Sequence, residues 1–128
     1  MGEEADFESL AIRIVKNIEK NVKGVALEIH ANLTEDTPVD TGWARSNWVA
    51  KLGRPSTTTV GSPGSVNPDS STQALLEISK FQSGKGPINI TNNVPYIGRL
   101  NKGSSKQAPS GFVEKAVQRA IKKIGGFR

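Results

Sequence analysis

The sequence predicts an α+β domain in which a long N-terminal helix and a C-terminal helix pack on a small, mainly antiparallel sheet. Apolar residues recur three or four positions apart near both ends of the chain, which is the period of an amphipathic helix. Two short segments in the middle alternate between apolar and polar residues, which is typical of half-buried strands. The chain of 128 residues fits one domain, and the elements follow in the order α-β-α-β-α.

The first helix has the longest periodic pattern. Its apolar residues are Phe7, Ala11, Ile14, Ile18, Val22, Val25, Ile29 and Leu33. A helix over 7–33 would extend about 40 Å, which is long for so small a domain. Gly24 weakens its middle by about 1 kcal/mol relative to alanine, so we expect packing to hold the helix there. The helix should end before Thr37-Pro38, because a residue that precedes proline disfavours helical angles.

A turn and a first strand are predicted next. Asp40-Thr41-Gly42 has the composition of a turn. The segment 46–52 alternates, with Trp48, Ala50 and Leu52 on one face of a strand. In the segment 53–70, thirteen of eighteen residues are Gly, Pro, Ser or Thr, which predicts a flexible loop with 57–60 as a candidate short strand inside it.

The middle of the chain predicts a second helix and a second strand. Helix 71–82 has apolar residues three apart, at Leu75, Ile78 and Phe81. The glycine-rich segment 83–87 ends it, and residues 88–91 alternate as a strand. Residues 94–97 are expected to continue in extended form, and a second flexible loop is expected at about 101–110.

The last predicted element is a helix from about residue 110 to residue 124, stopped by Gly125-Gly126. Its charges suit a helix, because Glu114 lies in the first turn and basic residues lie toward the end. The apolar stripe consists of Val113, Ala116, Val117, Ala120, Ile121 and Ile124.

The motifs of catalysis and of cofactor binding are weak. The chain has no cysteine, which excludes disulfides, thiolate metal sites and a cysteine nucleophile. His30 is the single histidine, and it cannot build a metal site or a catalytic triad without partners placed by the fold. Gly84-Lys85-Gly86 lacks the other glycines of a phosphate-binding loop and indicates a turn. We therefore predict a protein that is not an enzyme and holds no cofactor or metal.

The chain is also expected to be soluble and made in the cytoplasm. Its N-terminal residues are acidic, whereas a signal peptide begins with basic residues and an apolar run. No apolar stretch approaches the roughly 20 residues that span a bilayer.

Charge is distributed unevenly along the sequence. Residues 1–42 carry four basic and nine acidic side chains, whereas residues 43–128 carry thirteen basic and three acidic ones. This asymmetry suits nonspecific DNA binding, or head-to-tail contacts between copies in which acidic residues of one subunit face basic residues of the next. The candidate interface or DNA-facing residues are Arg99, Lys102, Lys106, Arg119, Lys122 and Lys123. Aromatic residues for base stacking are sparse in the basic C-terminal part.

Two segments resemble a known family. Thr-Pro-Val-Asp-Thr-Gly-Trp-Ala-Arg-Ser-Asn-Trp occupies 37–48 after the long helix, and the segments 90–97 and 107–113 precede the last helix. This pattern resembles the tail-completion or head–tail joining proteins of tailed bacteriophages, with their Thr-Pro-Val-Asp-Thr-Gly-x-Ala/Leu-Arg and Tyr … Gly … Ala-Pro-x-Gly motifs. The matching motif residues are Pro38, Asp40, Thr41, Gly42, Arg45, Trp48, Tyr96, Pro109 and Gly111.

The resemblance implies a structural virion protein of the neck or tail, assembled in the host cytoplasm. Such a subunit would form a ring of six or twelve copies between the head connector and the tail, contact other neck and tail proteins, and let DNA pass through the lumen without sequence-specific contact. The motif residues themselves are interpreted as fold-making: Pro38 ends the helix and Gly42 lets the chain reverse. The alternatives are a tail-terminator ring protein and a small basic DNA-binding protein.

Overall fold

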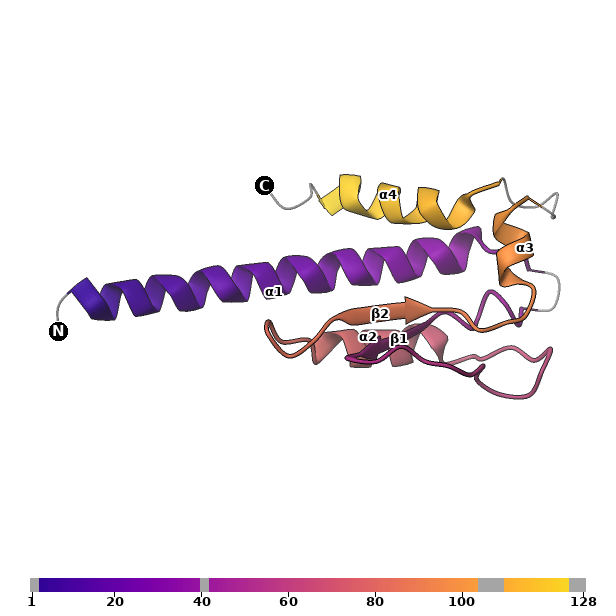
Figure 1. The fold of residues 1–128 in the computed structure, drawn as a ribbon, viewed down its shortest axis with the longest axis horizontal. Coiled ribbons are helices and arrows are strands. Elements are labelled where there is room, and N and C mark those ends of the chain that lie inside the picture. Colours follow the sequence, from indigo (N-terminus) through magenta and orange to yellow (C-terminus); the bar gives the residue numbers. More distant parts are fainter. Residues whose placement is uncertain (1–2, 40–41, 104–109, 125–128) are drawn as a thin grey trace.

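The computed structural model describes residues 3–39, 42–103 and 110–124. The predicted α+β class is confirmed, and a short extra helix precedes the last one (Figure 1). The elements are α1 (Glu3–Asp36), β1 (Val49–Leu52), α2 (Ser70–Ser79), β2 (Ile88–Thr91), α3 (Ile97–Asn101) and α4 (Phe112–Ile124).

Helix α1 is the longest element, with 34 residues and a length of about 50 Å. Its N-terminal half projects beyond the other elements (Figure 1). The described side chains of residues 8–18 are all exposed, whereas Val25, Ala26 and Leu33 are buried. We call residues 3–18 the stalk and the remaining elements the body. The predicted apolar stripe therefore exists along α1, but only its second half packs inside this chain.

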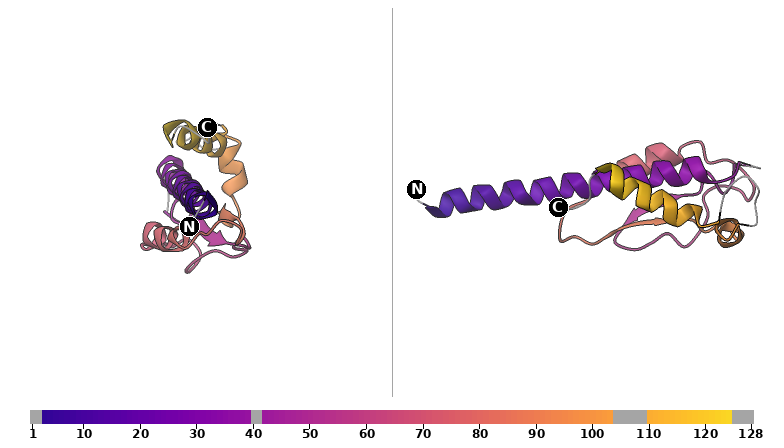
Figure 2. Two further views of the ribbon diagram at one scale, coloured as in Figure 1. Left: turned by 90° about the vertical axis from the view of Figure 1, so that its left-hand side faces the viewer. Right: turned by 90° about the horizontal axis from the view of Figure 1, so that it is seen from above.

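The body has three layers, with α1 in the middle (Figures 1 and 2). Helix α4 lies on one side of α1 and runs antiparallel to it, while α2 and the two strands lie on the other side. Helix α4 packs mainly on α1, so α1 separates it from most of the sheet. One buried cluster joins α1 to α4, with Leu33, Trp48, Phe112 and Ala116. A second joins α1, β1 and α2, with Ala26, Ala50, Ala74 and Ile78.

The sheet consists of β1 and β2 paired antiparallel, with Val49 opposite Thr91 and Leu52 opposite Ile88. Strand β1 is shorter than the predicted segment 46–52, because the chain turns up to residue 46 and Trp48 lies just before the first pair. The predicted alternation is present, since Trp48 and Ala50 are buried and Leu52 is half-buried.

The α2 region differs from the predicted pattern. Its buried residues are Ser70, Ala74 and Ile78, which lie four apart, and Leu75 is 51% exposed. Ile78 is buried as predicted, and the other two buried residues, Ser70 and Ala74, are small and allow α2 to lie close to β1. The helix ends at Ser79, three residues before the predicted end.

Two segments predicted to be extended are not. Residues 57–60 form no strand. At 94–97 the backbone turns into α3, because Asn92 Oδ1 accepts a hydrogen bond from the Val94 amide at 3.1 Å and the Ile97 amide donates to the Val94 carbonyl at 3.1 Å. The local side-chain bond from Asn92 stabilises a turn in place of strand pairing.

Candidate functional site

The turn after α1 is held by side chains of the helix end. The Thr37 hydroxyl donates to the Leu33 carbonyl at 2.6 Å and accepts from the indole Nε1 of Trp48 at 2.8 Å. His30 Nε2 donates to the Trp48 carbonyl at 2.8 Å. Trp48 is thus bonded to α1 directly through its carbonyl and indirectly, by way of Thr37, through its indole.

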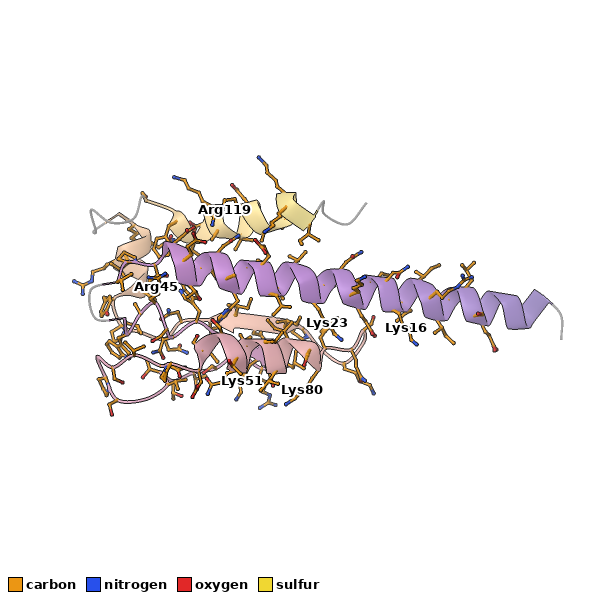
Figure 3. The ribbon with its side chains drawn as sticks, turned by 180° about the vertical axis from the view of Figure 1, so that it is seen from behind. Lys16, Lys23, Arg45, Lys51, Lys80 and Arg119 are labelled. Carbon is orange, nitrogen blue, oxygen red and sulfur yellow. The ribbon has the colours of Figure 1, made fainter. Side chains whose placement is uncertain are left out.

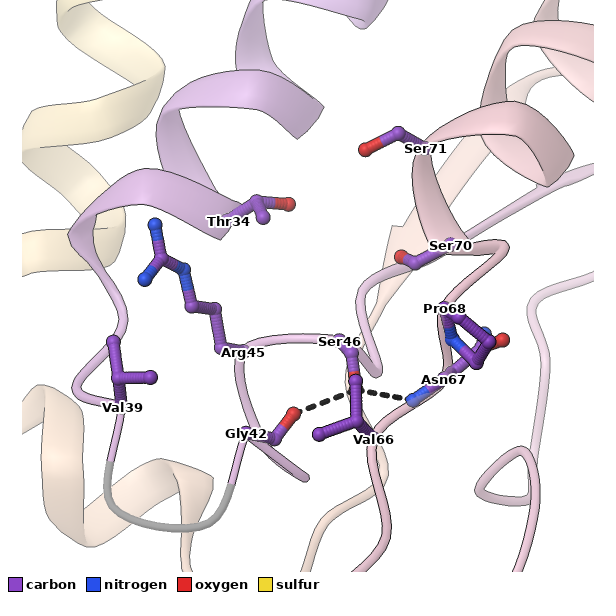
Figure 4. Close-up of a pocket in the computed structure, with 10 residues that line it drawn as sticks. All are labelled: Thr34, Val39, Gly42, Arg45, Ser46, Val66, Asn67, Pro68, Ser70 and Ser71. Carbon is purple, nitrogen blue, oxygen red and sulfur yellow. Dashed lines mark hydrogen bonds between the residues drawn. The ribbon is translucent and has the colours of Figure 1, made fainter.

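Gly42 occupies a position that only glycine fits well. Its φ is +77°, and a Cβ there would come within 2.6 Å of Val66 Cγ2. Ser46 Oγ donates to the Gly42 carbonyl at 2.6 Å and accepts from the Asn67 amide at 2.8 Å (Figure 4). The Val60 amide donates to Asn47 Oδ1 at 2.7 Å. The turn therefore anchors the segment 53–69, which has no helix or strand of its own.

Arg45 lines an open hollow of about 290 Å³ between the end of α1 and the start of α2 (Figure 4). It is half-buried and forms no ion pair with a described residue. Val39 and Val66 on the rim are 51% and 56% exposed. The hollow is lined by Thr34, Val39, Gly42, Arg45, Ser46, Val66, Asn67, Pro68, Ser70 and Ser71. Arg45, predicted only as a motif residue, therefore presents a cation beside apolar groups to solvent.

The structure brings the two segments of the resemblance together. Trp43 and Tyr96 meet edge to face, with ring centroids 5.9 Å apart and an interplanar angle of 65°. Asn92 Nδ2 donates to the Ala44 carbonyl at 2.8 Å. Gly111 has φ +76° just before α4, and its amide donates to the Asn101 carbonyl at 2.6 Å. The motif residues Asp40, Thr41 and Pro109 lie outside the described residues.

The candidate basic residues divide into paired and unpaired ones. Arg119 Nη1 lies 2.7 Å from Asp36 Oδ2, and Lys123 Nζ lies 3.0 Å from Glu28 Oε1. Arg99, Lys102 and Lys122 are exposed, and Lys106 lies outside the described residues.

These pairs bear on the charge asymmetry. The sequence left open whether the basic residues face DNA or acidic residues of another subunit, and two of them, Arg119 and Lys123, pair with Asp36 and Glu28 of the same chain. The reason is that α4 lies antiparallel along α1. Figure 3 also shows the labelled basic side chains, which come from α1, the turn after it, β1, the end of α2 and α4 and are spread along the molecule.

His30 has a structural position. It is 3% exposed, and burial lowers the pKa of its imidazole, a shift that the hydrogen bond to Trp48 opposes. Within the described part of the chain, no group of three His, Cys, Asp or Glu residues could hold a metal ion. No helix in that part is long and apolar enough to cross a membrane.

A candidate functional surface that the sequence analysis did not identify is the exposed apolar surface of the stalk. Leu10, Ile12, Ile14, Val15 and Ile18 are all exposed on a helix that carries no body element beside them. The signal was the predicted helix length, which exceeds what so small a domain can cover.

Comparison with protein-family models, with curated proteins and with solved structures finds no match for this chain.

Proposed function

We propose that this chain is a structural virion protein of a tailed bacteriophage, a tail-completion or neck ring subunit that joins the head connector to the tail. The observation that carries the proposal is the contact between the two motif segments. Trp43 packs on Tyr96, and Asn92 bonds the Ala44 carbonyl. Segments about 50 residues apart in the sequence thus pack together into one scaffold, as expected if they belong to a single family pattern.

The exposed surfaces support an assembly role. Apolar side chains along the stalk and around the Arg45 hollow are open to solvent in the single chain. Large exposed apolar surface on a soluble protein typically marks an interaction site. A ring of six or twelve copies, bound to other neck and tail proteins, would cover such surfaces.

The proposed role is non-catalytic and needs no cofactor. The protein would be made in the host cytoplasm and would reside in the virion, without a membrane contact. Exposed cations such as Arg99, Lys102 and Lys122 supply nonspecific attraction for DNA passing through the lumen.

Two other functions are alternatives to a tail-completion or neck subunit. A tail-terminator ring protein would share the size and the α+β character, and it would differ in its position in the virion. A small basic DNA-binding protein is less well supported, because the Arg119 and Lys123 charges are matched locally by Asp36 and Glu28.

Deletion of the gene from the phage that encodes this chain tests the proposal. We expect filled heads and tails of normal length that fail to join, and restored joining when the wild-type chain is supplied. Tails of uncontrolled length would instead indicate a terminator, because a terminator stops growth of the tail tube. Normal, infectious particles would contradict both ring functions.

A further inference from the structure

In the described part of the chain, strand β2 has a free edge. The Gly53 amide donates to the Pro87 carbonyl at 2.9 Å, in continuation of the register that places Leu52 opposite Ile88. Hydrogen-bonded and non-bonded pairs alternate along an antiparallel ladder, so Ile88 and Ile90 belong to the non-bonded pairs. Both residues therefore direct their backbone N–H and C=O groups away from β1.

The outer edges of the two strands differ in their surroundings. At the edge of β1, the Leu52 amide donates to Glu77 Oε2 of α2 at 3.1 Å. At the edge of β2, no described residue forms a hydrogen bond with the outward backbone groups of Ile88 and Ile90. A strand edge with unpaired N–H and C=O groups is a template for pairing with another extended segment.

An apolar hollow of about 270 Å³ lies beside this edge, between α1 and β2. Figure 1 shows β2 alongside the second half of α1, so the hollow belongs to the body and not to the stalk. All its lining residues are apolar: Val22, Val25, Ala26, Ile29, Ile88 and Ile90. Ile88 and Ile90 thus direct their side chains toward α1 and their backbone groups off the sheet.

The free backbone groups and the hollow together specify what can bind there. An antiparallel strand at this edge has two residues opposite Ile88 and Ile90, and each of them exchanges both N–H···O bonds with its partner. These two residues lie two positions apart, and side chains of directly opposite residues lie on the same face of a sheet. Their side chains therefore point toward α1 and into the hollow, whereas the side chain between them faces away. A lone apolar side chain would fill the hollow but leave the N–H and C=O groups of β2 unpaired.

We propose that the edge of β2 binds an extended segment of another protein, which joins the sheet as a third, antiparallel strand and places two apolar side chains, two residues apart, in the hollow against α1. Backbone hydrogen bonds supply affinity, and the hollow selects apolar residues at alternate positions. This binding does not depend on the proposed phage function. In a neck ring, the segment would come from a neighbouring neck or tail protein.

Amide hydrogen exchange measured by NMR on the full chain tests the free edge first. The Asn89 and Thr91 amides should be protected by β1, whereas the Ile88 and Ile90 amides should exchange about tenfold faster or more, because nothing accepts their hydrogens. Equal protection of all four amides would mean that the chain itself or a second copy already covers the edge, and this result would overturn the proposal.

A synthetic peptide then tests strand addition. The probe is Lys-Thr-Val-Thr-Val-Thr-Lys with blocked ends, whose two valines lie two residues apart. At millimolar concentration it is expected to shift the amide resonances of Ile88 and Ile90 and to slow their exchange. Absence of these shifts would overturn the proposal.

Two control peptides separate strand addition from simple filling of the hollow. A peptide of the same composition with adjacent valines cannot place both side chains in the hollow. A peptide methylated at both valine amides keeps its side chains but loses the N–H groups that face β2. Both should bind about tenfold more weakly than the probe or worse. Unchanged binding of the methylated peptide would contradict pairing with the strand edge.

A pair of substitutions in α1 tests the hollow. Val22→Gln places a polar amide in it and should weaken binding of the probe by about fivefold or more. Asn21→Gln is the matched control, because Asn21 is the exposed neighbour on the same helix and does not line the hollow. This variant should bind the probe like wild type, and circular dichroism checks that both keep their helix content. Equal effects of the two substitutions would show that the peptide binds elsewhere and would overturn the proposal.

Discussion

The indole Nε1 of Trp48 lies 2.8 Å from the hydroxyl oxygen of Thr37, and this hydrogen bond joins the residue just after α1 to the residue just before β1. Both residues are buried, with exposures of 6% and 1%. The Thr37 hydroxyl in turn donates a hydrogen bond to the Leu33 carbonyl in the last turns of α1. The turn that resembles the phage motif is therefore a rigid corner between the long helix and the sheet.

This corner predicts that Trp48 contributes strongly to stability. Trp48→Ala is expected to lower the free energy of unfolding by about 3–5 kcal/mol, because it opens a cavity beside Leu33 and Phe112 and removes the bond to Thr37. Trp43→Ala, at the half-buried edge contact with Tyr96, should cost clearly less. Urea unfolding of both variants measures the difference. A Trp48→Ala protein within about 1 kcal/mol of wild type would show that the corner is not built this way.

Gly42 predicts a second, position-specific effect. Gly42→Ala and Gly53→Ala both force alanine into a left-handed conformation, at φ +77° and +81°, which costs about 1–2 kcal/mol. At Gly42 the new Cβ also meets Val66, whereas nothing lies within 4 Å at Gly53. We expect Gly42→Ala to be the worse variant by about 1 kcal/mol, and Val66→Ala in that background to remove the excess. Thermal unfolding that ranks the two alanine variants equally would contradict the contact.

His30 predicts a pH dependence of stability. Burial lowers the pKa of the His30 imidazole in the folded chain below its value of about 6.5 in the unfolded chain. Below about pH 6.5 the unfolded chain therefore binds more protons than the folded chain. The free energy of unfolding should therefore fall as the pH drops below that value, with a slope of up to about 1.4 kcal/mol per pH unit. His30→Gln keeps a donor for the Trp48 carbonyl and does not titrate. Denaturant unfolding between about pH 7.5 and 5.5 should show the slope in wild type only; the same slope in both proteins would assign it to other groups.

The contact between Glu28 and Lys123 predicts a weak coupling between α1 and α4. Their side chains are 24% and 67% exposed, so a double-mutant cycle with Glu28→Gln and Lys123→Gln should give about 0.2–1 kcal/mol at low salt. Added salt should reduce it, because the pair is partly open to solvent. Lys122→Gln is the control, since Lys122 forms no ion pair with a described residue. Coupling of Glu28 to Lys122 and not to Lys123 would contradict the structure, because α4 would have to be rotated about its own axis to bring Lys122 against α1.

The sequence predicted the structure best where hydrophobic periodicity coincides with a residue that restricts the backbone, such as proline. The apolar face of α1, its end near Thr37-Pro38 and the burial of Trp48 all follow from spacing and from the restriction that proline imposes. The helix itself is longer than the predicted 7–33, because it begins at Glu3 and ends at Asp36. Periodicity could not show which half of α1 packs, because Ile14 and Ile18 belong to the same stripe as the buried Leu33. An apolar stripe shows which face of a helix can pack, but it does not show which part of that face another element covers.

Other misses have a common physical cause. The prediction for α2 chose the large Leu75 as a core residue, whereas the helix approaches β1 through the small Ala74. The stripe predicted for α4 omitted Phe112, which is among the largest fully buried side chains. The Asp36–Arg119 pair joins residues far apart in the chain. Each depends on how elements pack together, which local spacing does not specify.

Cryo-electron microscopy of the virion neck tests the central claim most directly. The proposed function predicts a ring of six or twelve copies of this chain between the head connector and the tail, with the long α1 identifying each copy in the map. Absence of the chain from the neck, or its presence only at another position in the particle, would contradict the assignment.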